Sequence, residues 1–495
     1  MKHLFKLRWA LLFVLIFSYS CSKDDDATDG GGGEEITLES DVNDFVWKSM
    51  NSWYLWQSEV GNLADSKDDN TNSYYEFLNG YDTPEGLFSN VLSSKDRFSY
   101  IESDYNNLFN SFSGVAKTNG VQFVVTRPPE GGTKVIGVVR YVVNGSDADV
   151  KGIKRGDIFY AIDGTELYAV TDSQGRITES NFSLFDSDSY TMNFANIENN
   201  QVVANNVNVE LNKSELTENP IHIHKTLDVN GTKIGYLMYN QFVADFDEQL
   251  NDAFSQFKSS GATELVIDLR YNPGGSVTSS TRLASLITGQ FTGSLFSKAT
   301  WNSKWSDFDE NNNFVDNIDG TALNSLNLSK VYIIATDDSA SASELLINGL
   351  DPWIQVIHIG DTTVGKNEFS ITLIDNPSGA TPYAYTGENS LANANPNHKY
   401  ALQPLVGTNE NADGFSDFTT GLIPDIEKFE VLGDLGTLGD INEPLLATAI
   451  EQITGVSAKS LKRKFSDDLN IKTLKSSNDF LPYRKISNYD LYRLK

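Results

Sequence analysis

The feature that most limits how this chain can fold is an alternation of apolar strands and amphipathic helices between Ile221 and about Gly455. A hairpin signal with Asn230-Gly231 at its turn precedes an amphipathic helical pattern, and the apolar strand ELVIDLR follows. Strand-helix-strand units of this kind cross over right-handed and build a largely parallel sheet with buried strands. The pattern predicts an α/β domain over residues 215–455 with the largest core of the chain.

Two further regions precede this domain, as expected for a chain of 495 residues. Residues 37–105 carry many aromatic residues at helical spacing, which predicts an N-terminal helical cap whose aromatic side chains are core. Residues 113–212 consist of short β-rich runs separated by Gly, Asn and Asp turns. We therefore expect an α/β core, a β-rich domain and a helical cap.

The β-rich region resembles a PDZ domain, because a short helix, a Gly-x-x-x-Gly-Asp turn and a buried strand follow one another between Asn144 and Leu167. A loop with only one glycine falls where that family keeps its carboxylate-binding loop; its residues are Gly120, Val121, Gln122 and Phe123. The resemblance implies that N–H groups of this loop bind a peptide's terminal carboxylate. The adjacent strand edge would then pair with the peptide.

The N-terminal segment has a basic start and an apolar run that ends at Phe17, too short to span a bilayer. It predicts a secretory signal peptide over residues 1–20. Cys21, the only cysteine, follows as in the lipobox of bacterial lipoproteins, which implies a lipid anchor in the outer membrane, facing the periplasm or the cell surface. Residues 21–36 form a polar, Gly-rich tether. Its Lys-Asp-Asp start is similar to the export tag of Bacteroidetes surface lipoproteins, although a plain solvated linker is the alternative.

The charge of the chain excludes one class of partner. The sequence has 67 acidic and 38 basic residues, a formal net charge of −29, and loss of residues 1–20 with their three bases takes it to −32. Such an excess repels phosphate backbones, so no nucleic acid is expected as a partner. Residues 456–495 have the opposite balance, with ten Lys or Arg against four Asp or Glu. We expect this basic tail to lie on the acidic body, and its sequence indicates no chemistry.

The stretch DDSASASELL, which starts at Asp337, joins an apolar strand to a helix. Ser341 and Glu344 have the spacing of a capping box, in which the hydroxyl accepts a backbone N–H and the carboxylate reaches back. The same position gives the serines free N–H groups and the positive end of a helix dipole, which favour developing negative charge. This stretch alone leaves a structural and a catalytic role open, and also the choice among Ser339, Ser341 and Ser343.

Two other features bear on the catalytic interpretation. The strand ELVIDLR ends in a turn where Gly274 and Gly275 let backbone N–H groups approach a ligand, as an oxyanion hole requires, although most Gly-Gly turns are plain loops. Lys366 follows Gly365 after another apolar strand. An exposed lysine is ordinary, but burial would lower its pKa toward neutrality and let the neutral amine take a proton from a serine.

The SASASE run, the later Gly-Lys and the segment DLRYNPGG resemble the S41 family of C-terminal processing (tail-specific) serine proteases, over most of residues 37–455. In that family the middle serine of the run is the nucleophile and a lysine base lies 25 positions later. Lys366 lies 25 positions after Ser341. The resemblance therefore implies a Ser341–Lys366 dyad in a serine endopeptidase of the cell envelope, acting on protein or peptide substrates.

The resemblance also implies a crotonase-like spiral of ββα units and acyl transfer, with an oxyanion hole built from Ala342, Gly274 and Gly275. One departure is Ser370, because many family members have a glutamine at this position, four residues beyond the lysine, that orients the amine. Ser370 is thus a candidate third member. The departure leaves open a non-catalytic lipoprotein that binds peptides in a PDZ-like groove. Acyl-thioester chemistry ranks last, because it explains neither the Ser-Lys pair nor the PDZ-like region.

Four histidines lie in the predicted body of the protein, and none belongs to a motif. No carboxylate or third histidine accompanies the His-Ile-His pair at ligand spacing. We expect structural roles, no metal and no cofactor for His222, His224, His358 and His398.

Overall fold

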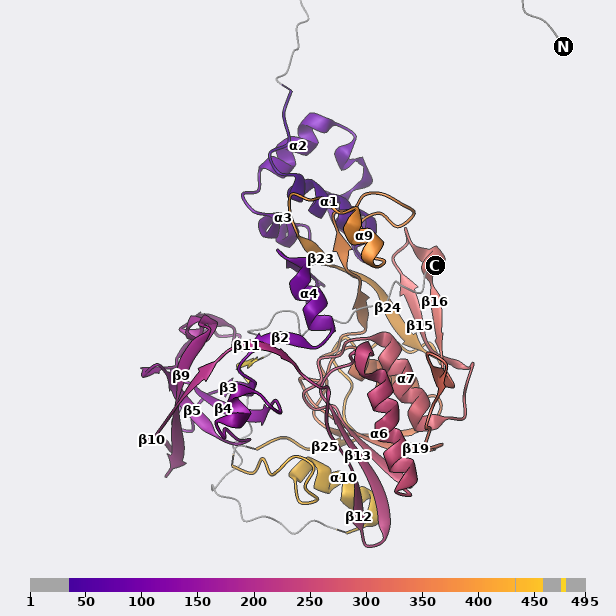
Figure 1. Ribbon diagram of the computed structural model, residues 1–495. Helices are drawn as coiled ribbons and strands as arrows, with labels where there is room; N and C mark the ends of the chain where they lie inside the picture. The colour runs from indigo at the N-terminus through magenta and orange to yellow at the C-terminus, as the bar shows by residue number, and fades with distance from the viewer. Residues whose placement is uncertain (1–34, 432, 457–472, 478–495) are drawn as a thin grey trace, which may run out of the picture.

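The computed structural model describes residues 35–431, 433–456 and 473–477, and a six-stranded sheet forms its centre (Figure 1). The order is β12 (Ile221–Val229), β13 (Thr232–Tyr239), β14 (Glu264–Asp268), β19 (Lys330–Ala335), β20 (Gln355–Gly360) and β25 (Ile426–Glu427). β12 and β13 form an antiparallel hairpin, and the remaining neighbours pair in parallel. Asn230 and Gly231 have positive φ at the hairpin turn, as their sequence predicts.

Helices cover both faces of this sheet. Along β13, Leu237 and Tyr239 point to one face, whereas Tyr236 and Met238 point to the other. The first face packs against α6 (Asp247–Ser259), α7 (Val277–Thr288) and α8 (Ala342–Leu350), and the second against α10 (Pro444–Thr454). Burial on both faces explains why the strands are continuous apolar runs.

The helical cap shares the core of the α/β domain. It contains α1 (Asp41–Trp53), α2 (Thr71–Asn79) and α3 (Pro84–Asn90), which lie at the top of Figure 1. Ser40 caps α1 by accepting the N–H of Asn43 at 3.2 Å. Trp53 of α1 stacks on Trp305 of the α/β domain with ring centroids 4.0 Å apart. The cap therefore packs with the α/β domain as one body, and α4 (Tyr105–Phe112) leads onward.

The β-rich domain, at the lower left of Figure 1, has a core of its own. Its sheet has the order β10 (Gln201–Asn212), β9 (Ser189–Glu198), β5 (Ile158–Ile162), β4 (Ile136–Val142), β3 (Val121–Thr126) and β26 (Lys475–Ser476). The short helix α5 (Asp147–Val150) lies where the sequence predicts one. β2 (Val115–Thr118) pairs with β11 (Ser214–Thr217), so the chain enters and leaves the domain side by side. The strand β26 comes from the basic tail, and no local pattern indicated it.

Smaller sheets complete the α/β domain. The sheet of β16 (Glu310–Asn313), β15 (Leu295–Trp301), β24 (Leu405–Asn411) and β21 (Glu368–Ser370) holds the chain after Lys366. A three-stranded sheet of β1 (Tyr100–Glu102), β23 (Ala401–Gln403) and β22 (Leu373–Ile374) joins the end of the cap to this region. The other short elements are β6 (Thr165–Glu166), β7 (Ala169–Thr171), β8 (Ile177–Ser180), β17 (Asn317–Ile318), β18 (Thr321–Ala322) and α9 (Glu388–Ala392).

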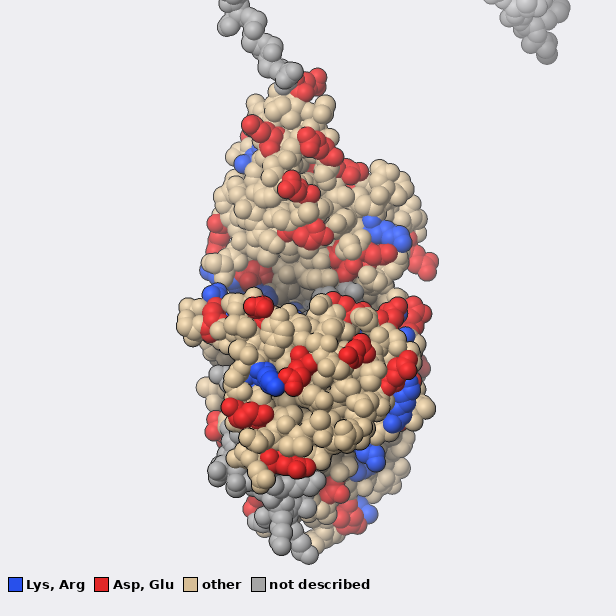
Figure 2. Space-filling model, turned by 90° about the vertical axis from the view of Figure 1, so that its left-hand side faces the viewer, with Lys and Arg blue, Asp and Glu red and all other residues tan. Residues whose placement is uncertain are grey.

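The predicted fold class is confirmed: a mixed α/β core carries a helical cap and a β-rich domain. Figure 2 shows a hollow between the cap above and the β-rich domain below, and Asp and Glu outnumber Lys and Arg on this face. The predicted signal peptide, Cys21 and most of the tether and basic tail lie outside the described residues. Within the described ranges, no helix has the length and apolar character needed to cross a membrane.

Candidate active site

Ser341 lies where the chain turns from β19 into α8, beyond the carboxyl end of the parallel strands. Its backbone has φ 58° and ψ −109°, a region that residues with a side chain rarely adopt. Ala342 begins the helix directly afterwards. A strained serine in a sharp strand-to-helix turn presents its hydroxyl beside the helix N-terminus, as catalytic serines of hydrolases do. The sequence predicted the junction but not the strain.

The three serines of the run differ in what their hydroxyls bind. Ser339 donates to the carbonyl of Leu269 at 2.8 Å, and Ser343 donates to the carbonyl of Asn272 at 3.0 Å. Both hydroxyls therefore hold the serine run against the end of β14. Among the described residues, no acceptor takes the hydroxyl proton of Ser341, whose side chain is 7% exposed. Ser341 is thus the serine whose proton is free for transfer.

The glycine turn after β14 lies directly against Ser341. A Cβ on Gly274 would stand 2.9 Å from the Cβ of Ser341, so only glycine allows this approach. The N–H of Gly274 donates to Asn272 Oδ1 at 2.9 Å. In the part of the chain that the structure describes, no acceptor binds the N–H groups of Gly275 and Ala342. These two donors are available for an oxyanion near the Ser341 hydroxyl.

Glu344 joins the serine segment to the lysine segment. Its Oε2 accepts the N–H of Ser341 at 2.7 Å and the N–H of Lys366 at 2.9 Å. Its Oε1 accepts the N–H of Gly365 at 2.6 Å and the hydroxyl of Thr363 at 2.5 Å. Burial raises the pKa of Glu344, and these hydrogen bonds oppose that rise. One carboxylate oxygen thus fixes the main chain of both predicted dyad members, in addition to its predicted capping role.

Lys366 is placed in a desolvated environment. Its side chain is 2% exposed, and burial lowers the pKa of its amine to about 8. The negative charges of Glu368 and Asp96 act in the other direction and raise this pKa, but burial has the larger effect. The Nζ atom lies 5.1 Å from the centroid of the Phe98 ring. Burial also raises the pKa of Glu368. A substantial fraction of the Lys366 amine is therefore neutral in mildly alkaline water, which a general base requires.

The helical cap and the segment behind it contribute to this site, which the sequence did not reveal. The Arg97 guanidinium donates to the carbonyls of Val364, at 3.3 Å, and Gly365. Phe98 then contacts the Lys366 amine. The aromatic richness of residues 37–105 indicated a core, and no local signal distinguished Phe98 or Arg97 from other cap residues.

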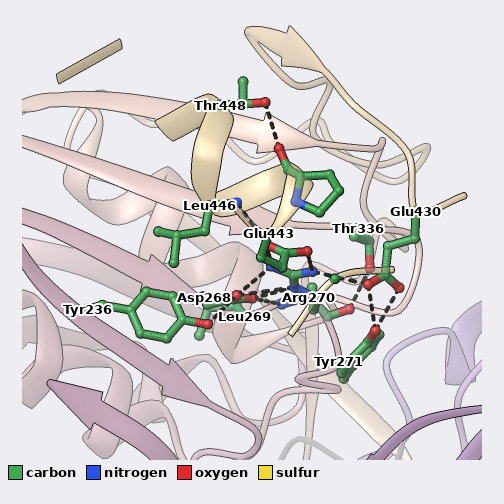
Figure 3. Close-up of polar contacts among 12 residues, drawn as sticks. Tyr236, Asp268, Leu269, Arg270, Tyr271, Thr336, Glu430, Glu443, Leu446 and Thr448 are labelled. Atoms are coloured by element: carbon green, nitrogen blue, oxygen red, sulfur yellow. Dashed lines mark hydrogen bonds and ion pairs between the residues drawn. The ribbon is translucent and has the colours of Figure 1, made fainter. Parts of the chain in front are cut away.

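A buried charge network holds the end of β14, from which the glycine turn departs (Figure 3). The Arg270 guanidinium is fully buried and donates to Asp268 at 2.8 Å, to Glu443 at 2.6 Å and to Glu430 at 3.0 Å. Tyr271 donates its hydroxyl to Glu430 at 2.6 Å. The sequence does contain an indication of this network: Asp268 and Arg270 lie in the apolar strand ELVIDLR, and charged residues in a buried strand are expected to be paired.

The β-rich domain is ion-paired to the same region. Arg155 binds Glu430 at 2.5 Å and donates to the Tyr271 hydroxyl at 2.7 Å. Burial alone would raise the pKa of Glu430, but the charge of Arg155 helps to hold it well below its ordinary value. Arg140 binds Asp338, the residue directly before the serine run, at 2.5 Å. The two domains therefore meet through buried charges next to the glycine turn and the serine.

The remaining predicted residues are one serine and four histidines. Ser370 is buried on β21, opposite Leu405 of β24. Each histidine has a neighbour of its own: the ring of Tyr141 for His222, Gln256 for His224, the carbonyl of Ala335 for His358, and Asp375 for His398. Across the described ranges, no group of three His, Cys, Asp or Glu side chains is arranged to hold a metal ion.

The loop predicted to bind a carboxylate lies at the start of β3. The N–H of Gly120 donates to the Thr118 hydroxyl at 3.0 Å, and the N–H of Val121 donates to Asn119 Oδ1 at 3.2 Å. These two donors are therefore occupied within the loop. Beyond them, Gln122 and Phe123 contact the basic tail instead.

A strained serine at the carboxyl end of a parallel sheet, beside free main-chain N–H groups, is an arrangement typical of serine-dependent hydrolases. Comparisons with known proteins point in the same direction. Residues 233–384 match the model of peptidase family S41, and residues 41–100 match that of the peptidase S41 N-terminal domain.

Curated relatives agree with the family models. The chain is 24% identical over 339 residues to a carboxyl-terminal-processing protease of Picosynechococcus sp., covering 68% of this chain and 72% of that protein. It is 25% identical over 254 residues to the chloroplastic carboxyl-terminal-processing peptidase 3 of Arabidopsis thaliana, covering 49% of this chain and 45% of that protein. The second alignment thus spans less than half of either protein.

A solved structure from Bacteroides fragilis, assigned to the S41 proteases, superimposes with a TM-score of 0.63 at 23% identity, over 83% of this chain and 97% of that one. This likeness establishes the fold. The family models and the curated relatives show that the chain is similar to S41 C-terminal processing proteases, and this similarity supports a serine-type peptidase.

Proposed function

We propose that this protein is a serine endopeptidase that cleaves protein or peptide substrates with a Ser341–Lys366 dyad. The observation that carries the proposal is the state of Lys366, a buried amine whose pKa lies at about 8. Its main chain is bound to the same Glu344 oxygen as the N–H of Ser341. A base poised near the working pH, held to the segment of an activated hydroxyl, is what nucleophilic catalysis needs.

The chemistry follows from the groups around Ser341. The neutral amine of Lys366 takes the hydroxyl proton while Ser341 Oγ attacks a peptide carbonyl carbon. The carbonyl oxygen becomes an oxyanion, which the N–H groups of Gly275 and Ala342 stabilise. Lys366 then gives the proton to the departing amine, and an acyl-enzyme ester remains. Water, deprotonated by Lys366, attacks this ester and releases the new carboxylate and Ser341.

The assignment of the other predicted residues follows the same geometry. The N–H of Gly274 already donates to Asn272, so Gly274 is not a donor to the oxyanion. Its role is to let the turn lie close to Ser341, because it has no side chain. Glu344 positions both dyad members. Ser370 lies on β21, four residues after Lys366, and we retain it as the candidate that orients the Lys366 amine.

The test is proteolysis of an unfolded protein such as casein by the purified enzyme. We expect Ser341→Ala and Lys366→Ala each to lower the cleavage rate by at least about 10³-fold, since members of a dyad act as a unit. Ser260→Ala, at an exposed position on the same domain, is the matched control and should cleave at the parental rate. Full activity in either dyad variant would overturn the proposal.

We further propose that the protein works in the cell envelope, with a lipid on Cys21 after removal of residues 1–20 and with the β-rich, PDZ-like domain engaging substrate. The sequence pattern around Cys21 supports the anchor. Cys21→Ala should release the protein from the outer-membrane fraction, and protease treatment of intact cells should show which side it faces. Retention of the variant in the membrane would contradict the anchor.

A further inference from the structure

The outer edge of β3 in the β-rich domain is covered by a segment from the far end of the chain. Residues 473–477 run antiparallel to β3, with Lys475 opposite Val125 and Ser476 opposite Val124. The N–H of Leu474 donates to the carbonyl of Val125 at 2.9 Å. We call residues 473–477 the tail strand. Without it, β3 would be an open sheet edge, since β4 lies on its other side.

Side chains of the tail strand fit distinct places on the domain. Leu474 packs against the core cluster of the β-rich domain. Three residues later, the Ser477 hydroxyl donates to Gln122 Oε1 at 2.6 Å and accepts the N–H of Phe123 at 3.1 Å. The Thr473 hydroxyl accepts from Arg140 at 3.3 Å. The edge therefore recognises an extended segment with an apolar residue followed, three positions on, by a hydroxyl residue.

The tail strand leaves this edge only partly satisfied. Gln122 is 3% exposed, yet its Nε2 has no acceptor among the described residues, and neither does the buried Nε of Arg140. Leaving a buried donor without an acceptor costs about 1–3 kcal/mol. Both side chains contact the tail strand through their other atoms. An occupant with better-placed acceptors would therefore bind this edge more favourably than the tail strand does.

The domain does not need the tail strand for its own core. Its buried cluster draws on β3, β4, β5 and β9, and Leu474 packs against it as a half-buried side chain. Only Lys475 and Ser476 pair with β3 in register. A short strand that adds to a completed sheet, with a few side chains in pockets, is the geometry of peptide recognition by strand addition.

We propose that the β3 edge is a docking groove for an extended internal peptide segment, and that the chain's own tail strand occupies it as a built-in competitor. The inference deepens the proposed function, because it assigns to the protease a docking preference for segments of the form apolar-x-x-Ser/Thr. Such a segment does not require a free C-terminus, since the N–H groups of Gly120 and Val121 are already bound within their loop.

Tethering makes the competition strong. A segment attached to the same chain has an effective concentration on the order of 1 mM. If the tail strand and a free peptide each bind the open edge with a Kd of about 10 μM, the tethered strand weakens the free peptide about 100-fold. A substrate must therefore displace the tail strand before it can dock. Segments that bind the β3 edge weakly are excluded by this competition, whereas segments that bind it strongly still dock.

The experiment measures peptide binding to the full chain carrying Ser341→Ala, so it does not depend on catalysis. The probe is a fluorescein-labelled peptide with the sequence of residues 471–480, IKTLKSSNDF, followed by fluorescence anisotropy. Leu474→Glu places a charge against the apolar cluster and should release the tail strand. We expect this variant to bind the probe about 100-fold more tightly than its parent. A probe with glutamate in place of its leucine should not bind.

Val150→Glu is the matched control, because it adds the same charge to the same domain at a position that is 80% exposed. It should bind the probe as weakly as the parent does. An unchanged affinity in a folded Leu474→Glu variant would overturn the proposal. If Leu474→Glu loses cooperative unfolding, Leu474→Ala replaces it in the experiment, and we expect Leu474→Ala to bind the probe about 10-fold more tightly than the parent. If both variants lose cooperative unfolding, the tail strand is an integral part of the domain and the proposal is wrong. Failure of casein cleavage would leave these binding results unaffected.

Discussion

The buried amine of Lys366 makes a prediction that concerns stability and can be tested without a substrate. Replacing Lys366 by methionine keeps much of the side-chain volume and removes the titrating group. The wild-type amine has a pKa of about 8 in the folded protein, lowered by burial from the ordinary value of 10.5. The unfolding free energies of the two proteins should therefore depend differently on pH.

The sign and the magnitude follow from proton linkage. Below pH 8 both the folded and the unfolded protein hold the proton on Lys366, and the folded state bears the full penalty of a buried charge. Between pH 8 and 10.5 the unfolded chain binds the proton and the folded protein does not, so wild-type stability rises by about 1.4 kcal/mol per pH unit from this group. The total is about 3 kcal/mol. Lys366→Met lacks this rise.

The assay is urea unfolding, followed by tryptophan fluorescence, at several values from pH 7 to pH 10.5. The stability advantage of Lys366→Met over the wild type should be about 3 kcal/mol larger at pH 7 than at pH 10.5, whatever its packing contributes at all pH values. Lys298→Met, which removes a lysine that is 39% exposed, is the control and should keep the wild-type pH dependence. Parallel curves for Lys366→Met and wild type would show that the amine is hydrated, which refutes the argument for Lys366 as base.

Three further predictions concern activity and the buried network. Peptide cleavage, measured as kcat/KM, should rise with pH through an apparent pKa of about 8, because Lys366, the proposed base, can accept a proton only when its amine is neutral; a flat profile from pH 6.5 to 9 would exclude this base. Gly274→Ala should abolish measurable cleavage while the protein stays folded by circular dichroism, because the added Cβ would stand 2.9 Å from the Cβ of Ser341; parental activity would show that the turn does not approach the serine in solution. Arg270→Met should lower the free energy of unfolding by about 3–5 kcal/mol in urea titrations, because Asp268 and Glu443 would lose their buried counter-charge; a loss below about 1 kcal/mol would contradict the network.

Local sequence was sufficient for the elements of the site. The hairpin at Asn230-Gly231, the strand-to-helix junction at Ser341 and the glycine turn all follow from residues within a few positions of each other. Turn formation, helix capping and hydrophobic periodicity depend on residues within such short windows, so these elements can be predicted from the sequence alone. The fold class followed from the same patterns, and the 25-residue spacing of Ser341 and Lys366 came from a family resemblance.

By itself, then, the sequence determined the kind of elements and their order, and it supplied the candidate residues for chemistry. Only the tertiary structure decided which partners these residues meet: Phe98 beside the Lys366 amine, Glu344 between two segments, and the tail strand on β3. Each of these contacts joins segments that no local pattern relates. Their physical basis is burial, because a pKa, a paired charge or an added strand depends on what surrounds a group in space, and that environment exists only once the chain has folded.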